Sequence, residues 1–190
     1  MKYDKSYLRK KYLIQRKKKY LTANKFKFNF DLIFKIIRKH FYKKKITIAG
    51  YYPSNYEVNI LNFLEKISKK KFKIALPVIN SSGGMNFKSW IFRDPLYVNK
   101  FGILEPKSSK KKIIPDLIMV PLVAFDNQLN RIGYGKGYYD RCLQKIRKIK
   151  KKTIFLGIAY SFQKCRSVPV NKYDFKLDYI FTEQGIISSK

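Results

Sequence analysis

Apolar residues recur at helical spacing in several stretches of the chain. Residues 30–42 and 139–149 place them at intervals of three and four, which is the pattern of a helix with one core-facing side. Residues 4–21 also predict a helix, although their apolar stripe is narrow and flanked by many cations. A further helix is expected to begin at 53–57, which would place Glu57 in its first turn.

Short apolar runs lie between these helices. Their length and their content of β-branched residues predict buried strands at 46–52, 72–79, 117–125 and 153–160. Pro77 indicates that the second of them ends at a site rather than continuing deep in a sheet. The alternation of strands and helices predicts an α/β fold with a largely parallel sheet and helices on both faces.

Length, cysteine use and hydropathy favour one globular unit. A chain of 190 residues with 45% hydrophobic residues fits a single domain spanning 1–190. Cys142 and Cys165 are far apart and indicate neither a disulfide framework nor a zinc site. The longest apolar run, 117–125, is too short to cross a bilayer, so we expect a cytoplasmic monomer without a membrane segment. His40, the sole histidine, is interpreted as structural or solvated rather than as a general base.

The net charge of +31 has two interpretations. A nucleic-acid-binding module would combine this charge with the 31 aromatic residues on one surface. Lysine, however, accounts for 35 of the 43 basic residues, together with many Ile, Asn, Tyr and Phe, which is typical of A/T-rich codons. Lysine runs fall between the predicted elements, at 43–45, 69–71, 110–112 and 150–152. We therefore expect no specific nucleic-acid partner.

The third predicted strand leads into three glycines at alternate positions, Gly133, Gly135 and Gly137. Glycine tolerates positive φ, so this loop can point several backbone N–H groups at one anion, and the N-terminus of the next helix adds its positive dipole end. Arg131 and Lys136 favour phosphate over a neutral ligand. The pattern is neither a Rossmann nor a Walker A loop, and a tight strand-to-helix turn is the plain alternative.

Two segments around this loop resemble a known family: Val120-Pro-Leu-Val-Ala-Phe-Asp126 and Arg131-Ile-Gly-Tyr-Gly-Lys-Gly-Tyr-Tyr-Asp140. They are similar to the hallmark of the 5-formyltetrahydrofolate cyclo-ligases, also called 5,10-methenyltetrahydrofolate synthetases, and further similar segments follow the family's order from Lys5 to Glu183. The resemblance implies an enzyme that uses ATP and Mg²⁺ to convert 5-formyltetrahydrofolate to 5,10-methenyltetrahydrofolate, releasing ADP and phosphate. A small-molecule kinase that stops after phosphorylation is the enzymatic alternative.

The resemblance also assigns roles to individual residues. The implied ATP contacts are Lys5, Arg9, Arg131, Ile132, Gly133, Tyr134, Gly135, Lys136, Gly137, Tyr138 and Tyr139. The implied folate contacts are Tyr52, Glu57, Met85, Phe87, Trp90, Tyr134, Gly135, Lys136, Gly137 and Tyr138. Arg131 and Lys136 are the expected catalytic cations. Asp174 is implied as a magnesium ligand, and Asp140, which closes the glycine loop, is expected to share the ion.

Taken by themselves, these residues also fit plainer roles. Lys5 and Arg9, spaced i, i+4, fit a solvated basic face as well as a grip on phosphate. Glu57 fits a carboxylate at a helix N-terminus, and the apolar folate residues fit a core equally well. Asp140 fits a helix cap, and Asp174 fits a turn.

Overall fold

Helices and strands alternate along most of the chain. The computed structural model describes residues 4–20, 26–42, 45–107 and 109–188. The α-helices are α1 (Lys5–Tyr20), α2 (Asp31–His40), α3 (Leu61–Lys69) and α4 (Tyr138–Ile149). The strands are β1 (Thr47–Ala49), β2 (Lys73–Ile79), β3 (Met85–Trp90), β4 (Tyr97–Val98), β5 (Leu104–Glu105), β6 (Lys112–Ile113), β7 (Leu117–Pro121), β8 (Ala124–Phe125), β9 (Arg131–Ile132), β10 (Ile154–Ile158), β11 (Tyr179–Thr182) and β12 (Gly185–Ser188).

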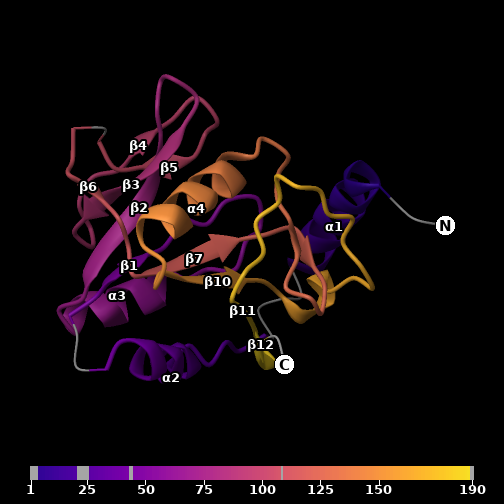
Figure 1. The fold of residues 1–190 in the computed structure, drawn as a ribbon, viewed down its shortest axis with the longest axis horizontal. Helices are drawn as coiled ribbons and strands as arrows, with labels where there is room; N and C mark the ends of the chain where they lie inside the picture. The colour runs from indigo at the N-terminus through magenta and orange to yellow at the C-terminus, as the bar shows by residue number, and fades with distance from the viewer. Residues whose placement is uncertain (1–3, 21–25, 43–44, 108, 189–190) are drawn as a thin grey trace.

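A central eight-stranded sheet runs through the molecule in the order β12-β11-β10-β7-β1-β2-β3-β6 (Figure 1). The five strands from β11 to β2 pair in parallel, whereas β12 at one edge and β3 and β6 at the other pair antiparallel. Two small antiparallel ribbons, β4–β5 and β8–β9, stand apart from this sheet. The predicted α/β fold with a largely parallel sheet is confirmed.

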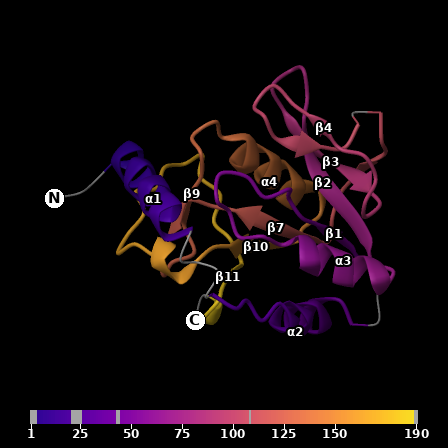
Figure 2. The ribbon, with the colours of Figure 1, turned by 180° about the vertical axis from the view of Figure 1, so that it is seen from behind.

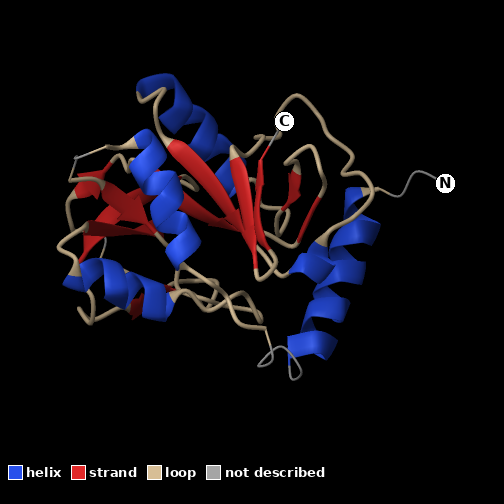
Figure 3. Cartoon of the chain, turned by 90° about the horizontal axis from the view of Figure 1, so that it is seen from below, coloured by secondary structure: helices blue, strands red, loops and turns tan. Residues whose placement is uncertain are grey.

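Helices cover both faces of the sheet (Figure 3). On one face α2 and α3 pack through residues such as Ile33 and Phe63 into a cluster that includes Leu117. On the other face α4 packs Leu143 against a cluster that includes Ile118. Every residue of β7 is buried, as expected of a parallel strand that is covered on both sides.

The first helix packs away from these layers, against the β8–β9 ribbon (Figure 2). Leu8 and Tyr12, spaced i, i+4, join Val123 and Ile132 in a separate apolar cluster. The narrow stripe of α1 is therefore enough to dock it, but on a ribbon that carries the start of the glycine loop. Leu21, which the stripe was expected to include, lies outside the described residues.

The strand order creates a switch point between β1 and β7. From β1 the chain continues through α3 to β2 on one side, and from β7 it continues through α4 to β10 on the other side. Loops that follow two neighbouring parallel strands and leave in opposite directions open a crevice at the carboxyl ends of those strands, where ligands of α/β proteins bind. The fold thus indicates a site beside β1 and β7.

Two predicted elements have different boundaries in the structure. The third helix begins at Leu61 rather than at 53–57, because Asn55 and Tyr56 have φ values of 47° and 63° that interrupt a right-handed helix. Glu57 is consequently in a loop, and its predicted place in a helical first turn is wrong. The apolar run 117–125 divides between β7 and β8.

The remaining expectations concern the surface. Within the described residues, no helix is long and apolar enough to span a membrane. Both cysteines are free thiols. The lysine runs lie at the ends of elements or between them, although Lys112 begins β6, and Lys43 and Lys44 fall outside the described residues.

Candidate active site

A cavity of about 700 Å³ opens at the carboxyl ends of β1, β2 and β7. The loop after β1 contributes Tyr51, Tyr52 and Glu57, and the ends of β2 and β7 contribute Pro77 and Pro121. The pairing of β2 with β1 ends at Ala75, so Pro77 lies past the end of β1. There it pairs with β3 on its other side. The prediction that this proline marks a site agrees with its place on the cavity wall.

The glycine loop forms one end of the cavity. All residues from Arg131 to Arg141 line it. Gly135 and Gly137 have φ values of 96° and 67°, and Gly137 leads directly into α4. These are conformations that L side chains rarely adopt, so the loop needs glycine at both positions. The loop therefore brings backbone N–H groups and the N-terminal end of α4 to the same cavity, as an anion site requires.

Two cations of α1 face this loop. The Arg9 Nε donates a hydrogen bond to the Gly133 carbonyl at 2.8 Å, and the Lys5 Nζ pairs with Asp174. Both side chains are partly buried and line the cavity, so the alternative of a solvated basic face is wrong. Lys136 is exposed and also lines the cavity.

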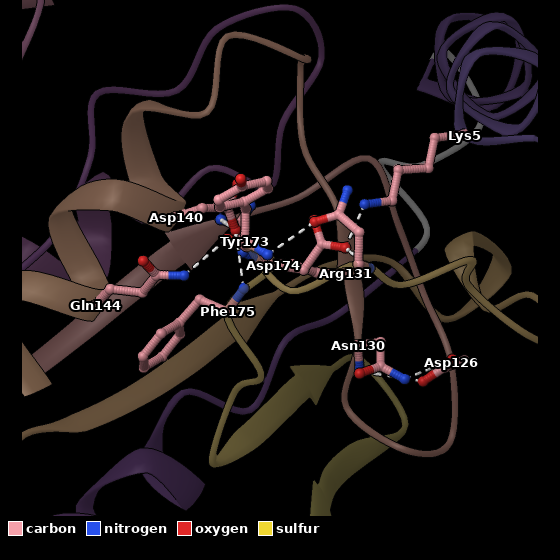
Figure 4. A network of polar contacts seen from close by, with 10 residues as sticks. Lys5, Asp126, Asn130, Arg131, Asp140, Gln144, Tyr173, Asp174 and Phe175 are labelled. Carbon is pink, nitrogen blue, oxygen red and sulfur yellow. Dashed lines mark hydrogen bonds and ion pairs between the residues drawn. The ribbon is translucent and has the colours of Figure 1, made fainter.

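Arg131 and Asp140 form an ion pair beneath the loop (Figure 4). The Arg131 Nη2 lies 2.7 Å from Asp140 Oδ1, which also accepts the backbone N–H of Phe175 at 3.2 Å. The helix cap is Gly137 and not Asp140, so the capping alternative for Asp140 is wrong. Asp174 does occupy a turn, because its Oδ2 accepts the Asn171 N–H at 2.6 Å.

Glu57 also lines the cavity and is 7% exposed. Its Oε1 accepts a hydrogen bond from the Tyr134 hydroxyl at 2.9 Å, and its Oε2 accepts the Ser54 N–H at 2.9 Å. Burial raises the pKa of Glu57, and the hydrogen bonds and the Arg16 guanidinium oppose that rise. The carboxylate of Glu57 is thus a fixed hydrogen-bond acceptor. Its position is set by hydrogen bonds from Ser54 and Tyr134 and not by the dipole of a helix.

The predicted apolar folate contacts divide into two groups. Tyr52 and Met85 line the cavity. Phe87 is packed in the core beside α4, and Trp90 is packed in the core on the opposite face of the sheet. Neither lines the cavity, because alternate residues of β3 point to opposite faces and both side chains are covered there. For these two residues the core alternative describes the structure, and the predicted contact is wrong.

Two arginines in or next to the cavity were not predicted from the sequence. Arg141 lines the cavity, and it donates to the Lys136 carbonyl at 3.1 Å and so ties the glycine loop to α4. Arg16 reaches the hydroxyl of Tyr134 from α1. Its i, i+4 spacing from Tyr12 places Arg16 on the buried face of α1. This spacing was available in the sequence, but Arg16 was passed over because an apolar stripe is traced through apolar residues. His40 is exposed, lies outside the cavity and contacts the Tyr179 hydroxyl at 2.8 Å.

The fold and the cavity together define an α/β enzyme whose site joins a cationic glycine loop to a buried carboxylate. A model of the 5-formyltetrahydrofolate cyclo-ligase family matches residues 1–183. A 5-formyltetrahydrofolate cyclo-ligase of Haemophilus influenzae is 32% identical over 136 residues, which cover 68% of this chain and 72% of that protein. One of Escherichia coli is 30% identical over 146 residues, covering 74% of this chain and 79% of the relative.

Solved structures give the same result. The 5,10-methenyltetrahydrofolate synthetase of Aquifex aeolicus superposes with a TM-score of 0.73 at 28% identity, covering 97% of this chain and 92% of that one. That of Mycoplasma pneumoniae superposes with a TM-score of 0.69 at 26% identity, covering 95% and 99%. The chain belongs to the 5-formyltetrahydrofolate cyclo-ligase family, and the resemblance seen in the sequence is confirmed.

Proposed function

We propose that this enzyme converts 5-formyltetrahydrofolate to 5,10-methenyltetrahydrofolate at the expense of ATP. The observation that carries the proposal is the set of residues that line the cavity at the switch point. Its cationic glycine loop suits phosphates, and its wall also offers the buried carboxylate of Glu57 together with Tyr51, Tyr52 and Met85, which suits a flat heterocycle with N–H donors. One cavity can therefore hold both reactants in contact.

The chemistry has two steps. The formyl oxygen attacks the γ-phosphorus of ATP, so an O–P bond forms and the bond to the β-phosphate oxygen breaks, releasing ADP. N10 then attacks the activated formyl carbon and loses its proton as the new C–N bond forms. Phosphate leaves with the former formyl oxygen when the ring closes. Phosphorylation is needed because an amide oxygen is otherwise a poor leaving group.

The protein's part in this scheme is alignment and charge neutralisation. Arg9 and the loop N–H groups would hold the phosphate chain, and Lys136 is free to follow the transferred group. Arg131, buried and paired with Asp140, would hold the floor of the loop rigid and fix the carboxylate of Asp140. Glu57 would accept N–H donors of the pterin. The scheme uses no covalent nucleophile of the protein.

The carboxylates near the loop fit a magnesium ion. Asp140 and Asp174 both line the cavity, and Asp174 is one residue from Phe175, whose N–H donates to Asp140. Within the described residues, the hydrogen bonds and ion pairs of each carboxylate use one oxygen, Oδ1 of Asp140 and Oδ2 of Asp174. A second oxygen of each is available to a hard cation, which usually takes one or two carboxylates besides phosphate and water. The ion would offset phosphate charge.

A direct assay tests the proposed function. Purified protein, ATP, Mg²⁺ and 5-formyltetrahydrofolate are mixed, and the absorbance of the methenyl product is followed. We expect the chromophore to appear only when ATP is present, with one ADP formed for each product molecule. ADP without the chromophore would favour the kinase that stops after phosphorylation, and neither product would reject the proposal.

Asparagine at Asp140 or Asp174 should weaken the use of Mg²⁺. Each change removes a ligand charge with little change in shape, so the Mg²⁺ concentration for half-maximal activity should rise at least roughly tenfold. Asp140→Asn should also lower the melting temperature, because the buried Arg131 loses its counter-charge. Asp174→Asn should affect stability less, because its ion pair with Lys5 is more exposed. An unchanged Mg²⁺ dependence in both variants would reject the metal assignment.

The lysine run at 110–112 should be dispensable for catalysis. These residues are exposed and lie outside the cavity, and Lys110 pairs with Asp94 at 3.0 Å on the surface. Replacing all three by Gln should change kcat less than about threefold and stability by about 1 kcal/mol or less. A salt-dependent loss of kcat/KM is expected, because cations steer anionic substrates. A tenfold loss of kcat that persists at high salt would show a direct role.

A further inference from the structure

The most deeply buried cation among the described residues belongs to α1. Arg16 is 1% exposed, although it stands on a helix whose neighbouring Lys17, Lys18 and Lys19 are exposed. A buried guanidinium is costly unless it is paired and fully hydrogen-bonded. Among the described residues Arg16 contacts no carboxylate directly, and its Nε has no partner. Because burying Arg16 costs stability, we infer that its position serves the function of the protein.

Its contacts lead into the cavity. The Arg16 Nη1 donates to the Leu122 carbonyl at 3.2 Å, and its Nη2 donates to the hydroxyl of Tyr134. The Tyr134 hydroxyl in turn donates to Glu57 Oε1 at 2.9 Å. Arginine carries no acceptor, so the direction of this chain is fixed: the tyrosine must accept from Arg16 and place its own hydrogen on Glu57. Both oxygens of Glu57 then act as acceptors, one from Tyr134 and one from Ser54.

The same helix also holds the other side of the loop. Arg9 contacts the Gly133 carbonyl, and Arg16 is two turns further along α1, on the same face. The two arginines thus bracket the loop around Tyr134. Arg9 contacts the backbone of the glycine loop, whereas Arg16 contacts the Tyr134 side chain that leads to Glu57.

We propose that Arg16 is a positioning residue for folate binding, which acts through Tyr134 to keep Glu57 an ionised acceptor for the N–H edge of the pterin. The inference rests on the proposed function. The first helix would then have two roles: Arg9 contacts the glycine loop, and Arg16 supports recognition of the heterocycle. The predicted ligand class is a fused heterocycle that offers donors, and a heterocycle that offers only acceptors at that edge should bind poorly.

The surroundings of Glu57 support this role. The ionisable groups that act on it are Arg16 from α1, Tyr134 from the glycine loop, Tyr139 from α4 and Tyr51 after β1. Arg16 is the one cation in this set. Burial raises the pKa of Glu57, and Arg16 lowers it. Removing Arg16 should therefore raise the pKa of Glu57 further, so that the carboxylate loses its charge at a higher pH than in the wild type.

The test measures binding of 5-formyltetrahydrofolate by calorimetry, without ATP, in the Arg16→Met variant. The dissociation constant should rise roughly 10- to 100-fold at pH 7, because a charge-assisted contact chain is lost. The sign with pH follows from Glu57: because removal of Arg16 raises the pKa of Glu57, the loss of affinity should grow as the pH falls and shrink as the pH rises and the carboxylate ionises. Lys17→Met, one residue away and exposed, is the matched control and should bind as the wild type does.

A second measurement does not depend on the substrate. The chain has four glutamates, so carbon-13 labelling of their carboxyls and a Glu57→Gln spectrum identify Glu57. Its titration should move to higher pH in Arg16→Met, and also in Tyr134→Phe, which cuts the same chain of contacts if Arg16→Met fails to fold. An unshifted titration, or a loss of affinity that is equal at every pH, would overturn the inference. A shifted titration in a protein that forms no methenyl product would reject the proposed function alone.

Discussion

Replacing Arg9 by Ala is expected to lower kcat/KM for ATP by roughly 30- to 1,000-fold. Arg9 is a partly buried cation at the glycine loop, and losing a charged phosphate contact costs about 2 to 4 kcal/mol of transition-state stabilisation. Its hydrogen bond to the Gly133 carbonyl also shapes the loop, so part of the loss should appear in kcat. Lys5→Ala should act in the same direction, because Lys5 lies one turn earlier on the same face.

The control for this prediction is Lys10→Ala. Lys10 adjoins Arg9 but is exposed, and it should retain wild-type kinetics. Stability should change by about 1 kcal/mol in Arg9→Ala, the usual net value of one hydrogen bond. Steady-state kinetics with ATP varied, and thermal unfolding of the ligand-free protein, separate the two effects. Wild-type kcat/KM in Arg9→Ala would show that the phosphate chain binds elsewhere.

A methyl group at Gly135 is expected to reduce activity roughly 10- to 100-fold. The φ of 96° disfavours any L side chain, and a Cβ would lie 3.2 Å from the Arg9 Cζ, so the guanidinium would have to move. A misplacement of about 1 Å in a positioning group costs about two orders of magnitude, so a smaller shift of Arg9 together with the strained backbone should cost roughly one to two. The expected cause is a misplaced Arg9 rather than an unfolded protein.

Gly83→Ala separates these causes. Gly83 also has a positive φ, of 79°, but a Cβ there meets nothing within 4 Å, and it lies in the turn between β2 and β3. Both variants should lose about 1 to 2 kcal/mol of stability from the strained backbone. Activity should fall in Gly135→Ala alone. Equal losses of activity in the two variants would attribute the effect to stability.

Those parts of the site that depend on neighbouring residues could be predicted from the sequence. The glycine loop, Arg131 and Lys136 beside it and the helix after it lie in one continuous stretch, 131–149, and local φ preferences and helical spacing are enough to place them. The alternation of apolar runs was likewise enough for the α/β class, because parallel strands buried on both faces must be continuously apolar.

The docking of α1 could not be predicted from local spacing. The spacing of Lys5 and Arg9 showed that they share one face of the helix. That this face turns toward the glycine loop follows from the packing of Leu8 and Tyr12 on the β8–β9 ribbon, which also buries Arg16. Periodicity reports which residues lie together on an element, not which distant surface that element meets. Arg16, with no apolar signal, could be assigned to the interior only from the tertiary structure.

By itself the sequence determined the order of most elements, the glycine loop and the family, because these depend on local spacing and on contiguous motifs. Tertiary structure decided the strand order, which brings the loop after β1 beside the loop after β7. It also decided that Glu57 meets Tyr134 across 77 positions of sequence, while Phe87 and Trp90 turn into the cores. Contacts of this range are selected by the packing of whole layers, and no local preference of either residue specifies its partner.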